Sequence, residues 1–243
     1  MDQSNSDLGA VYDRDFQHGI EEPSVRSARR VWPALLSAIA APASVADFGC
    51  GAGYWLAALR EILPPCDILG VDHPSVPDYG LRIAADRFVG ADLTQPVDLG
   101  RRFDLCLSVE VAEHLPAQHA PGFVATLVRH ADLIAFSAAI PGQGGTSHLN
   151  EQWPAYWIAL FAAHGYRCHD VIRPRIWNDA LIECSYRQNL LLFANAGASA
   201  RLPGDAPDWG GADLVHPQLF ELAHRRWTAR TPRNLYRFLT RRL

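Results

Sequence analysis

Short apolar runs alternate with helix-forming stretches along most of this chain. Five runs have the length of buried strands. They are residues 45–48, 67–72, 87–91, 103–108 and 133–139. The helix-forming segments between them predict an α/β fold, with a mainly parallel sheet and helices on both faces. A last pair of strands is expected at 166–171 and 188–194.

The first strand ends in a turn with three alternating glycines, Gly49, Gly51 and Gly53, before a helix expected at 54–62. Glycine allows a tight turn and lets a ligand approach the backbone without a Cβ in the way. The first amides of the following helix are unpaired and can face an anionic group. This arrangement at the carboxyl end of a strand is typical of nucleotide-binding α/β proteins.

The spacing of the glycines separates two classes of nucleotide site. A dinucleotide fingerprint requires G-x-G-x-x-G, but Tyr54 or Leu56 stands where the third glycine would be, which disfavours a nicotinamide oxidoreductase. The sequence DFGCGAG at 47–53 instead resembles motif I of class I S-adenosylmethionine (SAM)-dependent methyltransferases, and the resemblance covers roughly residues 25–194. It implies a Rossmann-like fold with an antiparallel last strand, SAM as the methyl donor and S-adenosylhomocysteine (SAH) as the product.

Acidic residues lie at the ends of the first three strands. Asp72 ends the second strand, 25 residues past Asp47, where a carboxylate can accept hydrogen bonds from both ribose hydroxyls or simply cap a turn. Asp92 follows the third strand, and the resemblance implies a contact with the adenine amino group; an ordinary surface loop is the alternative. The residues expected to bind the cofactor are Asp47, Gly49, Gly51, Gly53, Asp72, His73, Ala91, Asp92, Leu93 and Glu110.

Two histidines are candidates for the chemistry at the methyl group. His114 ends the sequence EVAEH at 110–114, which resembles the segment after the fourth strand in the family. It either contacts the acceptor or anchors the loop before Pro116. His148 lies in the glycine-rich loop 142–153, and its pKa range suits a base near neutrality, although an exposed loop histidine would have the same sequence context.

Methyl transfer from a sulfonium is an in-line displacement that needs no metal, so the enzyme chiefly positions donor and acceptor. A neutral hydroxyl acceptor must lose a proton, and a general base such as His148 or His114 would help. A metal site formed by His114, His148 and a carboxylate is an alternative, but the spacing of these residues matches no metal-ligand pattern, so no metal is expected.

Residues outside the core motifs are expected to contact the acceptor. Asn150 lies close to His148 in the loop, but it is also a candidate N-cap for a helix expected at 153–164. Tyr12 belongs to an arm similar to segments that fold over SAM in this superfamily, and large aromatic side chains suit a substrate wall or lid. The expected substrate-binding residues are Tyr12, Asn150, Trp153 and Trp177.

Composition and charge restrict the location and the partners. The chain has 243 residues, a net charge of −4 and five scattered cysteines without a C-x-x-C pair. Such cysteines are typical of reduced thiols in a cytoplasmic protein. The chain has no apolar run long enough for a membrane span, and its N-terminus lacks a signal-peptide pattern. The acidic net charge gives no reason to expect a nucleic-acid partner.

Charge and composition also divide the chain into four parts. These are an N-terminal arm or lid at 1–24, a SAM-binding domain at 25–195, a linker at 196–213 and a basic helical tail at 214–243. The tail holds seven arginines and one acidic residue, and its apolar positions predict an amphipathic helix broken near Pro232. It is expected to dock on its own domain, or else to contact a membrane surface, an acidic substrate or a partner subunit.

These patterns together predict a SAM-dependent methyltransferase for a small molecule, with O-methylation of a natural product, sugar or lipid-linked metabolite as the first choice. A hydroxyl acceptor would explain a histidine near the methyl group. N-methylation would use the same residues, whereas a carboxylate acceptor would require arginines such as Arg173 or Arg175. A non-catalytic SAM-binding module is the alternative from another class, and it would not depend on His114 or His148.

Overall fold

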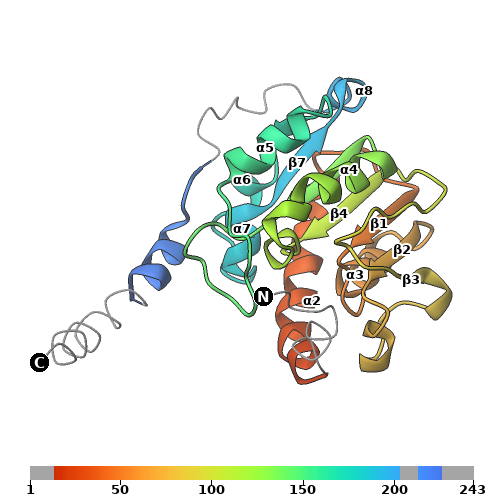
Figure 1. Ribbon diagram of the computed structural model, residues 1–243, viewed down its shortest axis with the longest axis horizontal. Coiled ribbons are helices and arrows are strands. Elements are labelled where there is room, and N and C mark those ends of the chain that lie inside the picture. Colours follow the sequence, from red (N-terminus) through yellow and green to blue (C-terminus); the bar gives the residue numbers. More distant parts are fainter. Residues whose placement is uncertain (1–13, 203–212, 226–243) are drawn as a thin grey trace, which may run out of the picture.

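The computed structural model describes residues 14–202 and 213–225, which include a seven-stranded sheet (Figure 1). The strands are β1 Ser44–Phe48, β2 Asp67–Asp72, β3 Phe88–Gly90, β4 Leu105–Val109, β5 Leu133–Ser137, β6 Arg167–His169 and β7 Leu191–Ala194. Their order across the sheet is β3-β2-β1-β4-β5-β7-β6. Strands β1 to β5 are parallel, and β7 runs antiparallel to both β5 and β6. The predicted mainly parallel sheet with an antiparallel last strand is confirmed.

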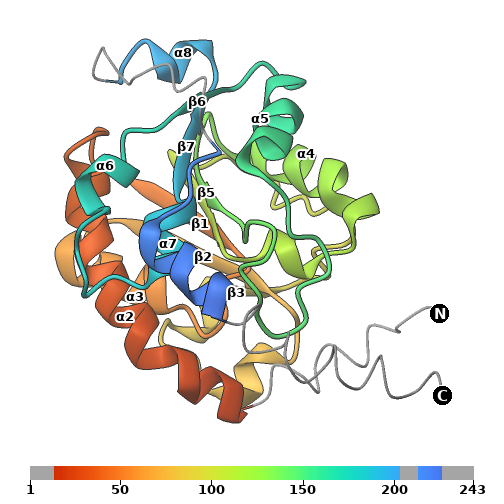
Figure 2. The same ribbon diagram turned by 90° about the vertical axis from the view of Figure 1, so that its left-hand side faces the viewer.

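Helices cover both faces of the sheet, as predicted. The α-helices are α2 Arg14–Leu36, α3 Tyr54–Ile62, α4 Ala120–His130, α5 Pro154–Ala162, α6 Arg173–Ile176, α7 Cys184–Asn189 and α8 Ala196–Ser199. Short 3-10 helices occur at Val76–Tyr79, Ala85–Arg87, Ala112–His114 and Ala117–His119. Helices α2 and α3 lie on one side of the sheet and α4 and α5 on the other (Figure 2).

The core consists of two apolar layers, because strands buried on both faces place successive side chains in opposite layers. In β5, Ile134 and Phe136 pack in the layer under α4 and α5, whereas Ala135 belongs to the layer under α2 and α3. The α2 layer is reinforced by Trp32, whose buried indole N–H donates to the backbone oxygen of Trp55 over 2.9 Å. These layers hold the carboxyl ends of the parallel strands at one edge of the sheet.

The predicted strand ends differ from the observed ones where tertiary hydrogen bonds prevail over local propensity. Gln188 and Asn189, expected to begin the last strand, instead end α7. The Gln188 side chain donates to the Leu214 carbonyl and accepts from the His216 amide, and Asn189 donates to Glu110. Both side chains are buried, so they need these partners, and β7 begins only at Leu191.

The described part of the tail docks on the domain. Residues 217–225 are helical, and His216 and Gln218 bond to side chains of α7. Helix α2 continues through the expected boundary between the arm and the domain at 24/25. The described residues do not include Tyr12, most of the tail arginines or the expected helix break near Pro232. None of the helices within the described ranges is both long enough and apolar enough to span a bilayer.

Candidate functional site

The glycine turn after β1 has a backbone that only glycine adopts easily. Gly49, Gly51 and Gly53 have φ values of 86°, 51° and 87°, in the left-handed region. The Gly49 amide donates to the Val71 carbonyl of β2 over 2.7 Å. A Cβ at Gly49 would lie 2.3 Å from Cγ2 of Val111, so the turn packs directly against the segment that follows β4.

Asp72, at the end of β2, ties the glycine turn to its own strand. One carboxylate oxygen accepts from the Gly51 amide over 2.7 Å, and the other accepts from the His73 amide over 2.6 Å. A carboxylate has about four acceptor positions, so capacity remains for ligand hydroxyls. Burial raises the pKa of Asp72 despite these two hydrogen bonds.

Asp47, in β1, lies beneath the same turn and is 2% exposed. Burial, together with the negative charge of Asp72, raises the pKa of Asp47 to about 7. Two carboxyl groups therefore meet at the carboxyl edge of β1 and β2. An acidic, glycine-lined edge of this kind fits a ligand that brings hydroxyl and ammonium donors, which is the donor set of SAM.

The segment after β3 lies at the same edge. The Ala91 amide donates to the Asp72 carbonyl over 2.7 Å. Asp92 accepts from the amide and the hydroxyl of Thr94, and Leu93 is buried. The structure thus brings the residues expected to bind the cofactor to one edge, formed by the ends of β1 to β4.

Glu110, directly after β4, connects three segments of the chain. Its φ of 55° is unusual for a residue with a side chain. Its carboxylate accepts from Gln143 over 2.8 Å and from Asn189 over 3.0 Å. The end of β4 is thereby joined to the loop after β5 and to the end of α7.

The two candidate histidines lie side by side. The rings of His114 and His148 are 4.9 Å apart between centroids and nearly perpendicular, at 81°. The loop is held there because the Glu113 carbonyl accepts from the amides of Leu149 and Asn150, over 2.8 and 2.9 Å. Burial, followed by the neighbouring His148, lowers the pKa of His114 to about 4, so that the ring is neutral near pH 7.

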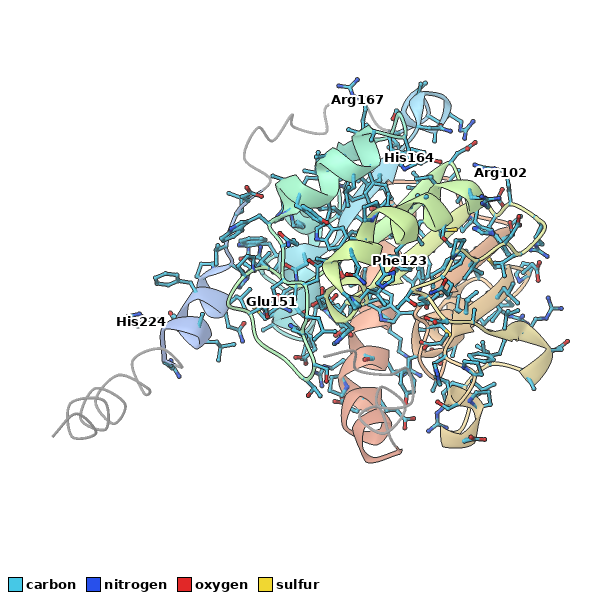
Figure 3. All side chains as sticks on the ribbon, in the orientation of Figure 1. Arg102, Phe123, Glu151, His164, Arg167 and His224 are labelled. Atoms are coloured by element: carbon cyan, nitrogen blue, oxygen red, sulfur yellow. The ribbon has the colours of Figure 1, made fainter. Side chains whose placement is uncertain are left out.

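His148 is oriented by a carboxylate of its own loop. Its Nδ1 lies 2.9 Å from an oxygen of Glu151, which also accepts from the amides of Gly142 and Gly144. Because a carboxylate accepts, Nδ1 carries the hydrogen, and in the neutral ring Nε2 has the lone pair. Glu151 is seen on the loop after β5 in Figure 3. The arrangement leaves an imidazole nitrogen able to take up a proton or hold a cation.

A family model described as a methyltransferase domain matches residues 20–166. The chain belongs to this family of methyltransferase domains. The predicted resemblance to class I SAM-dependent methyltransferases is therefore confirmed at the level of the family. No curated protein matches the sequence.

Solved methyltransferase structures share the fold. Human N-acetylserotonin methyltransferase in complex with SAM has a TM-score of 0.55 at 16% identity, covering 77% of this chain and 58% of its own. The plantazolicin methyltransferase BpumL, solved with a pentazolic desmethylPZN analog and SAH, has a TM-score of 0.55 at 15% identity over 79% of this chain and 92% of its own. The sugar N-methyltransferase KedS8 from Streptoalloteichus sp. ATCC 53650 has a TM-score of 0.53 at 18% identity, covering 79% and 93% of the two chains. This chain thus spans well under two thirds of the human protein and nearly all of the other two.

The residues expected to bind the acceptor are dispersed over the methyltransferase domain. Asn150 is buried beside Glu113 and accepts from Gln152, whereas the helix N-cap is Trp153, so Asn150 does not cap α5. Trp153 is 40% exposed at the start of α5. Trp177 packs against His216 of the tail, with ring centroids 4.6 Å apart. Contact of these residues with an acceptor stays a prediction.

Several residues of the site were not among those expected from the sequence. Glu113 is fully buried beside His114, and Gln143, Glu151 and Asn189 hold the loops around it. Local signals exist for two of these residues, because Glu151 lies three residues after His148 and Glu113 directly precedes His114. The contacts of Gln143 and Asn189 depend on segments that only the fold brings together.

Proposed function

We propose that this protein is a SAM-dependent O-methyltransferase for a small molecule. The observation that carries the proposal is the joining of two features at one sheet edge. The glycine turn with Asp72 offers a nucleotide-type site, and the Gly49–Val111 contact links it to the segment that carries His114 beside His148. SAM supplies a methyl group on a sulfonium, which is open to in-line attack.

Each side chain has a part that follows from its chemistry. Asp72 would accept from the ribose hydroxyls with the lone pairs that Gly51 and His73 leave free. The two imidazoles would face the acceptor, and Nε2 of His148, whose Nδ1 is held by Glu151, would receive the hydroxyl proton where no cation occupies it. Glu110 would keep the loop after β5 at the correct distance through Gln143.

The contacts of the arginines disfavour a carboxylate acceptor. Arg173 is 1% exposed and donates twice to Asp170, over 2.9 and 2.6 Å. Arg175 donates to the Val171 carbonyl. Because both guanidinium groups already have protein partners, they are poorly placed to bind a carboxylate acceptor. A hydroxyl or an amine is the better acceptor, and either group must lose a proton on methylation.

Calorimetric titration with SAM, SAH and NAD tests the cofactor. We expect micromolar binding of SAM and SAH and none of NAD. Asp72→Asn should weaken SAH binding by about 10- to 150-fold, the value of hydrogen bonds to a charged group. Asp86→Asn, at an exposed acid that precedes β3, should leave the affinity unchanged. Tight NAD binding, or no binding of SAH, would refute the proposal.

Turnover is tested by following SAH release with a panel of hydroxyl and amine acceptors. His148→Ala and His114→Ala should lower kcat by about 100-fold or more while SAH affinity stays constant, because general-base catalysis has at least this value. A pure SAM-binding module would show no acceptor-dependent turnover. That result would be consistent with the cofactor site and would refute the proposed methyl transfer.

A further inference from the structure

A fully buried carboxyl group, that of Glu113, lies beside the two histidines and interacts with the carboxyl group of Glu110. Glu113 is 0% exposed, and neither of its side-chain oxygens has a hydrogen-bond partner of ordinary geometry in the described part of the chain. Burial of an isolated carboxylate is costly unless a cation or a donor compensates for it. This side chain therefore points to a ligand that brings positive charge.

The neighbouring imidazoles supply what a cation needs. An oxygen of Glu113 and one nitrogen each of His114 and His148 lie within 4.8 Å of one another. Nδ1 of His148 faces Glu151 at 2.9 Å, and Nδ1 of His114 faces the Ser147 carbonyl at 3.4 Å. Both partners accept, so in a neutral ring the hydrogen lies on Nδ1, and Nε2 of His148 is then the nitrogen that can bind a cation. The backbone of Thr146 is a second hydrogen-bond partner of His114. A carboxylate on the far nitrogen of a histidine is typical of metal-binding histidines.

The ring of His148 packs directly against Gly145. A Cβ at Gly145 would lie 2.2 Å from Nε2 of this ring. The loop backbone at Gly145 does not have a positive φ, so the conformation itself does not demand glycine there. The absence of a side chain at position 145 is therefore explained by the close approach of the His148 ring.

We infer that Glu113, His114 and His148 bind a divalent first-row transition-metal ion such as Zn²⁺, Co²⁺ or Mn²⁺. Two imidazoles and one carboxylate are a ligand set that suits such ions and leaves at least one position open. With metal–ligand bonds of about 2.0–2.2 Å, the three side chains need to close by roughly an ångström around the ion. The spacing in the sequence gives this set no support, because Glu113 and His114 come from one 3-10 turn and His148 from a distant loop.

The catalytic role of the ion rests on the proposed methyl transfer and deepens it. An acceptor hydroxyl in the open position has its pKa lowered and gives its proton to solvent water. The oxygen then forms the O–CH₃ bond as the C–S bond of SAM breaks, and the electron pair goes to sulfur. The ion replaces direct proton transfer to His148. It favours an acceptor with two adjacent oxygens, because such a molecule can chelate.

Metal binding is measured first without any substrate. Protein treated with EDTA and dialysed is titrated with Zn²⁺ or Mn²⁺ by calorimetry, and with Co²⁺ by visible absorption. We expect one equivalent to bind. His114→Ala, His148→Ala and Glu113→Gln should each weaken binding by roughly 100-fold or more, and Glu151→Gln by about 10- to 100-fold. His164→Ala is the matched control, since this exposed histidine follows α5, away from Glu151 (Figure 3).

SAH affinity of the metal-free proteins separates the two proposals and reports folding. Variants that keep SAH binding but lose the metal support the metal site. Metal binding that persists in the variants, or wild-type protein that binds SAH but no ion, overturns it and leaves the proposed function intact. Metal binding without SAH binding keeps the site and refutes the methyltransferase proposal.

Discussion

Gly49→Ala is expected to destabilise the protein and abolish cofactor binding through two separable effects. The residue has φ +86°, and the new Cβ would lie 2.3 and 2.5 Å from the two Cγ atoms of Val111. The left-handed conformation costs an L-residue about 1–2 kcal/mol, and overpacking costs about 1–3 kcal/mol. Together these give a loss of about 2–5 kcal/mol in the free energy of unfolding.

A double-mutant cycle with Val111→Ala separates the two effects. Shortening Val111 removes both close Cγ contacts but not the backbone strain, so Gly49→Ala should cost less by about 1–3 kcal/mol in this background. The free energies are measured by urea denaturation, and SAH affinity by calorimetry. Gly122→Ala, at an exposed helical glycine with open space, should be neutral or stabilising by up to about 1 kcal/mol. If Gly49→Ala were as harmless as this control, or if Val111→Ala gave no relief, the reasoning about the turn would be wrong.

Three further perturbations test other parts of the structure. The pKa of Asp47 is about 7 in the folded protein and near 4 in the unfolded chain, so the stability of the wild-type protein should fall as pH rises from 4 to 7. Asp47→Asn should remove on the order of 4 kcal/mol of this fall, measured by denaturation at a series of pH values. An unchanged slope would contradict the assigned pKa. Gln188→Ala removes two hydrogen bonds to the tail, so the free energy of unfolding should drop by about 1–3 kcal/mol and limited proteolysis should cut residues 213–225 faster. Equal cleavage rates in the variant and the wild-type protein would argue against docking of this segment. Gly145→Ala should lower Zn²⁺ affinity without lowering SAH affinity, since its Cβ would collide with the His148 ring and displace it; an unaltered Zn²⁺ titration would show that the position of this ring does not matter for the metal.

The parallel strands could be predicted because their signals are local. A buried parallel strand is a short apolar run, and the glycine turn and Asp72 mark where two of them end. Residues 54–62 and 67–72 have the predicted bounds in the structure. Gln188 and Asn189 were assigned to a strand in error, because their partners are Glu110 and residues of the tail, which no local pattern reveals.

For the same reason, the sequence predicts the cofactor side of the candidate site better than the acceptor side. The cofactor edge is made of strand ends, whose positions follow from the fold class. The acceptor side depends on which loop meets which turn, and this is decided by backbone hydrogen bonds such as those of the Glu113 carbonyl. His114 and His148 were identified as separate candidates, but their contact and the buried Glu113 carboxylate required the structure.

The strained backbone at Glu110 explains how the two halves of the site are kept in register. A non-glycine residue at φ 55° persists only where its surroundings hold it, and here Gln143 and Asn189 bond its carboxylate from two different segments. The next residue, Val111, touches the glycine turn, and Glu113 follows in the same segment. A displacement of the loop after β5 would therefore reach the cofactor edge through Glu110 and Val111, within one short stretch of chain. The glycine turn and the loop that carries His148 are thus both held by the same five residues, 110–114.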